Sequence, residues 1–358
     1  MPRSPLDQLN PRRICLIKPS ALGDVIQALP VLAGLRKRWP DAHISWVVNR
    51  SFANLLEGHP DLNEIIEFPR HVKGFRRFSA MWRLARQLRK SRFDLVLDQQ
   101  GLLRSGLMTW VTRASRRVGF AHAREGATLA YTDKIDTDWK NISAVVKNWE
   151  MARALGCEGE PPTPLVPIRD EDRAWARRQI ASLPRPLLAI HPGAQWQTKR
   201  WPPEHFAELA SRAIKEFDAG IILVGGPGEG VICDRIREQI PSALSVAEQT
   251  TLKQLAAVLS ESDVYLSGDS GPMHLAAAVG VPVIAVFTCT SPTRAGPYWP
   301  GHRVVATCVD CAESYIKKCP SMICMQELTP DRVWPALETA LHRSPQREQG
   351  MIQGGAGF

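Results

Sequence analysis

The sequence predicts an α/β protein with two doubly wound, Rossmann-like domains. Short apolar segments of strand length alternate with segments of helical periodicity, once through the first half of the chain and again through the second. A proline-rich stretch without periodicity separates the two series at 158–169. We therefore predict a first domain over 1–157, a linker, a second domain over 170–343 and a flexible tail over 344–358, with the two domains facing a central cleft.

The first half contains five segments with the length and apolar character of buried strands: Ile14–Ile17, His43–Val48, Leu62–Phe68, Phe93–Asp98 and Arg116–Phe120. A helix with apolar residues at helical spacing is predicted between the first two strands, over Val25–Trp39. The turn that joins strand to helix contains Gly23 and Asp24, at the place where open parallel sheets bind ligands. Asp24 could also serve only as a helix cap, which is a common role for aspartate at such a position.

The second half begins the same alternation again, with these predicted helices and strands: Asp170–Leu183, Leu187–Ile190, Pro203–Phe217, Ile221–Val224, Leu252–Leu259 and Pro330–His342. The run Gly225–Gly230 is rich in glycine, but no G-x-G-x-x-G pattern fits it. We therefore do not expect a nicotinamide dinucleotide.

The stretch Val264–Phe287 predicts a strand, a tight turn, a helix and a second strand. The turn over Ser267–Gly271 contains two glycines, and Pro272 stands at a position that is favoured in the first turn of a helix. With no bulky side chain in the way, the free N–H groups at the start of this helix could seat a phosphate. The alternative is an ordinary strand–helix–strand crossover in which these residues only shape the turn.

Charge is distributed unevenly along the 358 residues, which carry a net charge of +9. Residues 1–150 contain 25 Lys and Arg against 14 Asp and Glu, whereas the remaining residues contain 20 against 22. The basic half is expected to meet a large anionic partner, such as a nucleic acid, a membrane surface or a phosphorylated substrate. Because the sequence carries no helix-turn-helix, zinc-finger or RNA-binding signature, we do not expect a nucleic acid.

The most basic segment runs from Arg70 to Phe93, with nine Lys and Arg and no Asp or Glu. Its apolar residues recur at helical spacing and predict an amphipathic helix with an opposite basic face. These residues are Phe75, Phe78, Trp82, Ala85 and Leu88. The helix could lie at an anionic membrane surface or bind a phosphorylated sugar. Alternatively, its apolar stripe packs on the sheet and its basic face is only solvated.

No apolar run reaches the ~18 residues of a membrane span, and the N-terminus lacks the apolar core of a signal peptide. We expect a cytoplasmic protein, with peripheral contact at the inner face of the membrane as an option. Its eight cysteines are then thiols or metal ligands rather than disulfides. Four late cysteines could bind structural zinc, but the spacing of the second pair is atypical and we expect ordinary thiols. They are Cys308, Cys311, Cys319 and Cys324.

Three segments occur in order along the chain: A-L-G-D-V-I-Q-A-L-P at 21–30, H-P-G-A-Q-W-Q-T-K-R-W-P at 191–202 and G-D-S-G-P-M-H-L-A-A-A-V-G-V-P at 268–282. Together they resemble glycosyltransferase family 9, the ADP-heptose:lipopolysaccharide heptosyltransferases, over essentially residues 13–343. The second segment looks more like the second heptosyltransferase than the first. The resemblance implies a GT-B fold and an inverting transfer of heptose from ADP-heptose to the inner core of lipopolysaccharide, an anionic glycolipid. It implies neither a metal ion nor a cofactor.

The resemblance also implies a site. Asp24 matches the general base of the family, and Lys199 matches the lysine that contacts the donor phosphate. The other donor-binding positions are Gly23, Thr198, Glu229 at the ribose, Thr250 and Leu252 at the adenine, and Asp269, Ser270, Gly271 and His274 at the pyrophosphate. On the basic half we expect three acceptor-binding residues, Arg76, Arg77 and Arg104.

The chemistry of an inverting transfer explains these residue types. A base must take the proton of the acceptor hydroxyl, and cations with N–H dipoles must stabilise the departing diphosphate. Each residue also has a structural alternative, because Lys199 could be a solvated surface charge, His274 could pack locally and Glu229 could lie on the surface. Competing functions are a transferase with another nucleotide sugar or glycan acceptor and a non-catalytic nucleotide-binding relative. The presence of both Asp24 and Lys199 argues against the second.

Overall fold

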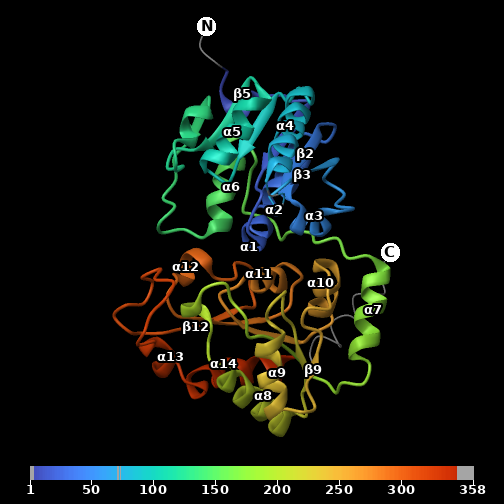
Figure 1. Cartoon of the computed structure of the whole chain (residues 1–358), viewed down its shortest axis with the longest axis vertical. Helices are drawn as coiled ribbons and strands as arrows, with labels where there is room; N and C mark the ends of the chain where they lie inside the picture. Colours follow the sequence, from blue (N-terminus) through green and yellow to red (C-terminus); the bar gives the residue numbers. More distant parts are fainter. Residues whose placement is uncertain (1–3, 71, 73, 345–358) are drawn as a thin grey trace. The chain divides into compact units, whose positions relative to one another are not determined.

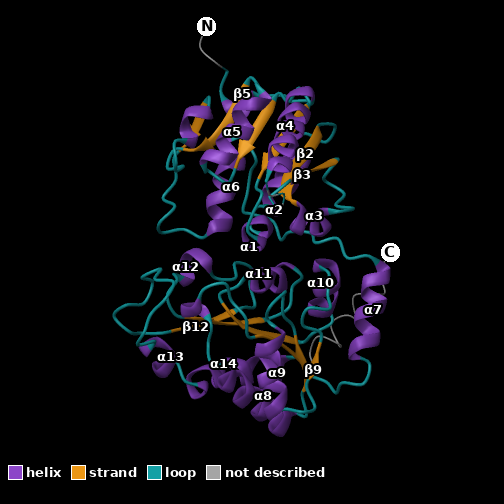
Figure 2. Cartoon of the chain, viewed as in Figure 1, coloured by secondary structure: helices purple, strands orange, loops and turns teal. Residues whose placement is uncertain are grey.

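The computed structural model describes residues 4–70, 72 and 74–344, and the chain divides into two compact units, Met1–Pro167 and Ile168–Phe358. Each unit contains one six-stranded sheet in which every pair of neighbouring strands is parallel (Figures 1 and 2). The tail predicted over 344–358 lies outside the described residues apart from Ser344.

The sheet of the first unit has the strand order β3-β2-β1-β4-β5-β6. Its strands are β1 (Arg13–Ile17), β2 (His43–Asn49), β3 (Glu64–Phe68), β4 (Leu95–Asp98), β5 (Arg116–Phe120) and β6 (Asp133–Ile135). Its helices are η1 (Leu6–Gln8), α1 (Leu22–Ile26), α2 (Leu29–Arg38), α3 (Arg50–Leu56), α4 (Phe75–Lys90), α5 (Leu103–Thr112), η2 (Ala127–Ala130) and α6 (Ala144–Ala154). The prediction of a single helix over Val25–Trp39 is wrong, because the chain turns between α1 and α2 and the first helix is short.

The second unit repeats this topology with the order β12-β11-β10-β7-β8-β9. Its strands are β7 (Leu187–His191), β8 (Gly220–Leu223), β9 (Leu244–Ser245), β10 (Val264–Gly268), β11 (Val283–Phe287) and β12 (Arg303–Ala306). Its helices are α7 (Asp170–Ile180), η3 (Gln197–Lys199), α8 (Pro203–Phe217), α9 (Gly230–Gln239), α10 (Leu252–Ser260), α11 (Gly271–Ala278), α12 (Pro292–Ala295), α13 (Ile323–Glu327) and α14 (Pro330–Arg343).

Both units confirm the prediction of doubly wound α/β domains. Their central strands β1, β4, β7 and β10 are buried along nearly their whole length, which is typical of parallel sheets covered by helices on both faces. In each sheet the strand order reverses between the first and fourth strands of the unit, and ligands bind at the carboxyl ends of the strands beside such a reversal. The fold therefore directs attention to the loops after β1 and β4 and after β7 and β10.

The strand–turn–helix–strand prediction for Val264–Phe287 is confirmed by β10, α11 and β11. Pro272 lies in the first turn of α11 as predicted. The chain leaves this helix through Gly280 in the left-handed conformation, with φ of 81°, which favours glycine. Among the described residues, no helix combines the length and the apolar character that crossing a bilayer requires.

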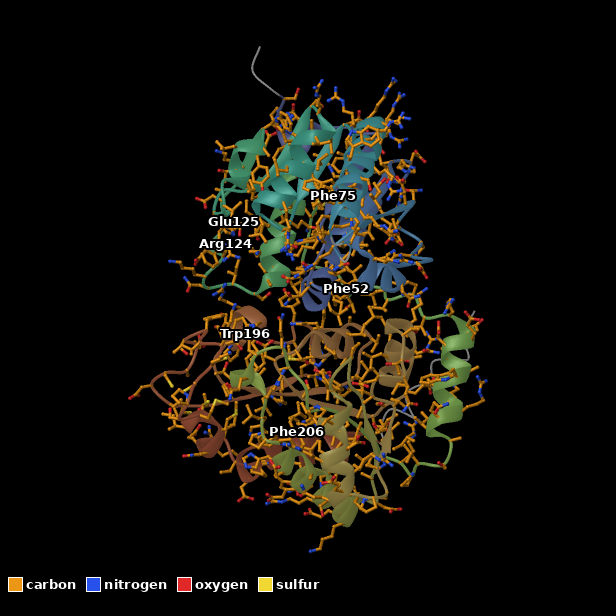
Figure 3. All side chains as sticks on the ribbon, in the orientation of Figure 1. Phe52, Phe75, Arg124, Glu125, Trp196 and Phe206 are labelled. Carbon is orange, nitrogen blue, oxygen red and sulfur yellow. The ribbon has the colours of Figure 1, made fainter. Side chains whose placement is uncertain are left out.

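Helix α4 differs from its prediction in the direction of its apolar side chains. The residues that pack into the core of the first unit are Leu84 and Leu88, with Met81 partly buried beside them. Phe75, which is labelled in Figure 3, is instead exposed, and so are Phe78 and Trp82. The prediction that these aromatic residues and Leu88 share one face is wrong, because the helix carries two apolar stripes and only the aliphatic one meets the sheet.

Candidate functional site

In the first unit, the loop after β1 brings a lysine and an aspartate together. Asp24 lies in the first turn of α1, where Oδ2 accepts a hydrogen bond from the Ala21 N–H at 2.9 Å. Its Oδ1 lies 3.3 Å from Nζ of Lys18, which is buried and also donates to the Gln99 carbonyl at 3.0 Å. The cap interpretation of Asp24 is therefore confirmed for one oxygen, while the other oxygen faces a buried cation.

The pKa of Asp24 lies below its ordinary value. Desolvation of the carboxylate raises the pKa. Attraction to Lys18, the hydrogen bond from the Ala21 N–H and the charge of Lys147 lower it, and their sum exceeds the effect of desolvation. The side chain is 46% exposed. Asp24 is thus an ionised carboxylate that solvent can reach, which is the state in which a carboxylate takes up a proton.

A second carboxylate shapes this site from within the sheet. Asp98, the last residue of β4, is fully buried and accepts hydrogen bonds from the Tyr131 hydroxyl at 2.8 Å and from two N–H groups of the following loop at 3.0 Å each. Burial raises the pKa of Asp98, although these hydrogen bonds lower it in part. By ordering the loop after β4, Asp98 places the Gln99 carbonyl where Lys18 can reach it.

The acceptor-binding candidates lie on two helices of the first unit. Arg76 is exposed near the start of α4. Arg104 is half-buried in the first turn of α5, and its Nε has no hydrogen-bond partner in the part of the chain that the structure describes. The side chain of Arg77 lies outside the described part, and its role stays a prediction. Gly23 is buried inside α1.

In the second unit, a buried histidine links two predicted site residues. His191 ends β7, and its Nε2 lies 2.9 Å from Oε2 of Glu229 while its Nδ1 lies 3.1 Å from Oγ of Ser270. Because a carboxylate only accepts, a neutral imidazole here carries its proton on Nε2 and accepts the Ser270 hydroxyl at Nδ1. The histidine therefore orients both the acid that follows β8 and the residue that caps α11.

Glu229 is held in one orientation by its surroundings. Its Oε2 also accepts the Gly226 N–H at 2.6 Å. Desolvation raises the pKa of Glu229, but His191, this N–H and Arg200 lower it below its ordinary value. A Cβ at Gly193 would lie 2.0 Å from Oε1 of Glu229, so only glycine leaves room for the carboxylate. The alternative of a free surface charge at Glu229 is wrong.

Lys199 is held just as tightly. Its Nζ lies 2.6 Å from Oδ2 of Asp269 and 4.5 Å from the centroid of the Trp196 ring. Asp269 Oδ2 also accepts the Thr290 hydroxyl at 2.6 Å. The Lys199 side chain is only 17% exposed, so the alternative of a solvated surface lysine is wrong. Asp269 acts on Lys199 and does not present a free carboxylate.

The remaining donor-binding candidates occupy different environments. Thr198 is buried, and its hydroxyl donates to the Ile316 carbonyl at 2.6 Å. His274 is buried in α11, and Gly271 is the first residue of that helix. Thr250 and Leu252 are half-buried around the start of α10. Asp269 and Ser270 are consecutive, so the Lys199 and Glu229 clusters form one group at the carboxyl ends of β7, β8 and β10.

Sequence reasoning missed three residues of these clusters. Lys18 lies just before the segment 21–30, and His191 is the first residue of the segment 191–202. Their roles were missed because each depends on contacts with residues of neighbouring strands. Trp196 also lies in the segment 191–202. Its ring contacts two lysines, because Nζ of Lys317 lies 5.1 Å from its centroid, in addition to Nζ of Lys199. The signal that could have found Lys18 is its position directly after a buried strand, in the loop that leads to Asp24.

The late cysteines are free thiols. Cys308 and Cys311 are exposed, Cys319 is half-buried and Cys324 is buried. In residues 4–70, 72 and 74–344, the structure gathers no group of three or more His, Cys, Asp or Glu side chains that could hold a metal ion.

The chain is similar to proteins named as lipopolysaccharide heptosyltransferases. The lipopolysaccharide core heptosyltransferase OpsX of Haemophilus influenzae is 29% identical over 303 residues, covering 82% of this chain and 84% of the relative. Lipopolysaccharide heptosyltransferase 1 of Pseudomonas aeruginosa is 29% identical over 360 residues, covering 92% and 98%. Lipopolysaccharide heptosyltransferase 2 of Salmonella typhimurium is 26% identical over 350 residues, also covering 92% and 98%. Since relatives of both numbered types match, likeness to the second type stays a prediction.

Solved structures agree with these relatives. A glycosyltransferase family 9 protein from Veillonella parvula superposes with a TM-score of 0.82 at 25% identity, covering 95% of this chain and 99% of that one. The Escherichia coli heptosyltransferase WaaC with ADP-2-deoxy-2-fluoro heptose superposes with a TM-score of 0.66 at 25% identity, covering 91% and 99%. The predicted GT-B fold is thereby confirmed. The sequence model of Glycosyltransferase family 9 (heptosyltransferase) matches residues 81–323, more than half of the chain, and the chain therefore belongs to this family.

Proposed function

We propose that this protein transfers heptose from ADP-heptose to the inner core of lipopolysaccharide, with inversion at the anomeric carbon. The observation that carries the proposal is the group formed by Lys199, Asp269, Ser270, His191 and Glu229 at the strand-order reversal of the second unit. It combines a fixed cation, a helix N-terminus and an oriented acid. Those are the groups that a nucleoside diphosphate needs for its phosphates and its ribose.

The donor is assigned to the second unit. The first N–H groups of α11 have no partner within the helix and lie at its positive end, so they suit the diphosphate. Lys199 adds a full positive charge beside them, held in place by Asp269. Glu229, ionised and oriented by His191, accepts a ribose hydroxyl. Thr250 and Leu252 line the adenine in this proposal, and Thr198 supports the loop of Lys199 through the bonds that its hydroxyl and its carbonyl make to Ile316 and Thr288.

The base is assigned to Asp24 in the first unit. The carboxylate takes the proton of the acceptor hydroxyl while that oxygen forms its bond to the anomeric carbon. The bond from this carbon to the diphosphate oxygen breaks, and ADP leaves with the electron pair. Lys199 and the α11 amides stabilise the negative charge that builds on the departing oxygen. Lys18 keeps Asp24 ionised before the reaction starts.

The acceptor is assigned to the basic first unit. Lipopolysaccharide is an anionic glycolipid, and the excess of Lys and Arg over residues 1–150 suits it electrostatically. Arg76, Arg77 and Arg104 remain the proposed contacts, with the buried unpartnered Nε of Arg104 as the most specific of them. Because such an acceptor is a membrane component, we also propose peripheral contact with the inner membrane surface.

Two matched substitutions test the base. Asp24→Asn keeps an oxygen for the Ala21 N–H but removes the basic carboxylate, whereas Asp24→Ala removes both. Both variants should lose transfer, by about 10²-fold or more, while binding ADP-heptose as the wild type does. The readout is ADP release with purified acceptor, together with calorimetric donor binding. Turnover of Asp24→Asn within a few-fold of the wild type would show that Asp24 is only a cap.

A panel of nucleotide sugars tests the donor. Thermal stabilisation and ADP release should be largest for ADP-heptose, because a ligand that binds the native state raises its stability. A larger response to another nucleotide sugar would reassign the donor within the family. Stabilisation without turnover for every donor and acceptor would indicate a non-catalytic nucleotide-binding relative.

A further inference from the structure

One side of the first unit exposes an unusually large set of apolar side chains. On α4, the exposed fractions are 93% for Phe75, 75% for Phe78 and 63% for Trp82. On α5, which packs beside α4, they are 50% for Leu103, 54% for Leu107 and 58% for Trp110. Leu129, on the η2 turn that packs against α5, adds 89%. We call these seven residues the apolar face.

The residues of the apolar face follow a regular pattern along the two helices. Its members recur at spacings of three or four residues along each helix, so they form one stripe on α4 and one on α5. Both helices pack into the hydrophobic core through other side chains, including Leu84 and Leu88 on α4 and Met108 on α5. The outward stripes are therefore additional to folding, and large apolar side chains exposed in such numbers on neighbouring elements mark an interaction site.

The charge around the apolar face is entirely positive on the two helices. Six of the sixteen residues of α4 are Arg or Lys, and neither α4 nor α5 contains an Asp or Glu. The Arg86 guanidinium lies 5.5 Å from the centroid of the Trp82 ring, so cation and aromatic side chain are interleaved.

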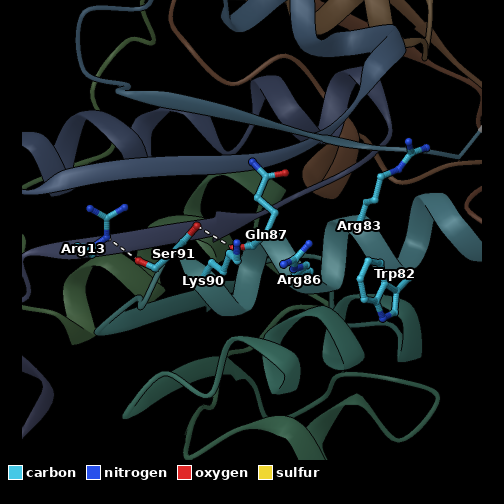
Figure 4. A pocket seen from close by; sticks show the side chains of 7 residues that line it. All are labelled: Arg13, Trp82, Arg83, Arg86, Gln87, Lys90 and Ser91. Carbon is cyan, nitrogen blue, oxygen red and sulfur yellow. Dashed lines mark hydrogen bonds between the residues drawn. The ribbon is translucent and has the colours of Figure 1, made fainter.

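A shallow basic hollow lies at the edge of the face. It encloses about 510 Å³ and is lined by residues of α4, by Ser91 directly after this helix and by Arg13 of β1 (Figure 4). Trp82 belongs both to this hollow and to the apolar face. The charged side chains in its lining are Arg13, Arg83, Arg86 and Lys90, and no lining residue is acidic. Such a hollow suits a phosphate group presented next to an apolar phase.

We propose that the apolar face and this basic hollow dock the protein on the surface of an anionic lipid bilayer. Aromatic and aliphatic side chains enter the interface between headgroups and acyl chains, while Arg and Lys pair with lipid phosphates. The two features together favour a bilayer over the other occupants of such a surface. A second copy in a two-fold contact would oppose the Arg and Lys residues of two α4 helices, and Glu125, whose Oε2 accepts the Leu103 N–H at 3.1 Å, would be outnumbered as their acidic partner. A nucleic acid would use the cations and aromatic rings but leave three exposed leucines without a role.

The inference deepens the proposed function, since a glycolipid acceptor requires a membrane, but its test uses no substrate. Wild-type protein is mixed with vesicles of phosphatidylcholine alone or with added phosphatidylglycerol, and the bound fraction is measured by flotation. We expect binding to the anionic vesicles, little binding to the neutral ones, and loss of binding at high salt.

Three variants and two controls locate the contact. The triple variant Phe75→Ser/Phe78→Ser/Trp82→Ser should lower partitioning more than tenfold, and Leu107→Ser/Trp110→Ser should lower it in the same direction. Arg83→Ser/Arg86→Ser should lower it about 25-fold, at about fivefold for each charge. Val231→Ser, at a residue 68% exposed on α9, and Arg178→Ser on α7 are matched controls in the other unit and should bind like the wild type.

Four results would overturn the inference. The first two are that the wild type does not float with vesicles, or that the wild type and the triple variant float equally. The third is that the wild type sediments as a dimer and the triple variant as a monomer. The fourth is that the wild type binds an oligonucleotide more tightly than vesicles and that the same variants abolish this binding. Circular dichroism shows that each variant is folded. Flotation without transfer would count against the proposed function alone, and transfer to a soluble acceptor without flotation would count against this inference alone.

Discussion

Replacing Lys18 by methionine should raise the pH at which transfer begins. The substitution keeps most of the side-chain volume but removes the buried ammonium group that lies 3.3 Å from Asp24. Attraction to this group is the strongest influence that lowers the pKa of Asp24. Without it, desolvation acts on the carboxylate with less opposition, and the pKa rises.

The size of the effect follows from the distance and the exposure. Two unit charges at 3.3 Å attract by about 1.3 kcal/mol in bulk water and about 5 kcal/mol at an effective dielectric constant of 20. Because Asp24 is 46% exposed, solvent screens the pair and the lower figure is the nearer one. Since 1.36 kcal/mol corresponds to one pKa unit, we expect the pKa of Asp24 to rise by about one unit.

Lys18→Met should also change how the free energy of unfolding depends on pH. A carboxylate whose native pKa is depressed stabilises the fold above its unfolded pKa of about 3.9, and that contribution disappears as the pH falls through the native value. Lys18→Met should therefore lose stability at neutral pH and differ less from the wild type in acid. Lys18→Arg keeps the charge and is the matched control.

The assay is the pH profile of kcat/KM for the acceptor at saturating donor, because its acid limb reports the base of the enzyme–donor complex that the acceptor meets. We expect the limb of Lys18→Met to move to higher pH by about one unit and that of Lys18→Arg to stay near the wild type. An acid limb that does not move in Lys18→Met, or that moves to lower pH, would refute the role of Lys18 as the counter-ion of the base.

Two further predictions concern the second unit. Lys199→Met should slow transfer by about 10²-fold and also lower the free energy of unfolding by about 3 kcal/mol, because it leaves a buried carboxylate unpaired. Adding Asp269→Asn should recover stability in urea denaturation but not the rate; recovery of both would mean that Lys199 acts only structurally. Gly193→Ala should weaken ADP binding about tenfold in calorimetry, since the new Cβ would lie 2.0 Å from a Glu229 oxygen and displace it. Gly226→Ala, where the Cβ would lie 3.6 Å from the same carboxylate, should bind ADP like the wild type, and equal losses in both variants would contradict the argument.

The regular elements that sequence predicted best are those with a continuous apolar run or a clear apolar face. The helix α8 matches its predicted range, and the β10–α11–β11 stretch matches in order and turn chemistry. The strands it missed, β6, β9 and β12, all lie at sheet edges. An edge strand is covered on fewer sides and needs no continuous apolar run, so periodicity does not mark it.

The error on α4 and the two open roles of Asp24 have the same origin. Both helix stripes on α4 satisfy the periodicity rule, and only the position of the sheet decides that Leu84 faces inward and Trp82 outward. At Asp24 the sequence supported two roles, a cap and a base. The structure shows that the two oxygens serve different partners, so the cap does not exclude the base.

The sequence by itself predicted the two doubly wound sheets and the family, which are confirmed, and it supplied the residues that we propose for the chemistry, because buried periodicity, turn composition and local motifs are properties of neighbouring residues along the chain. The tertiary structure alone decided which groups hold those residues in place. Lys18 reaches Asp24 and the Gln99 carbonyl only because β1 and β4 are adjacent, and His191 joins Glu229 to Ser270 only because β7 lies between β8 and β10. Contacts across strands depend on the order of the sheet, and no local pattern records that order.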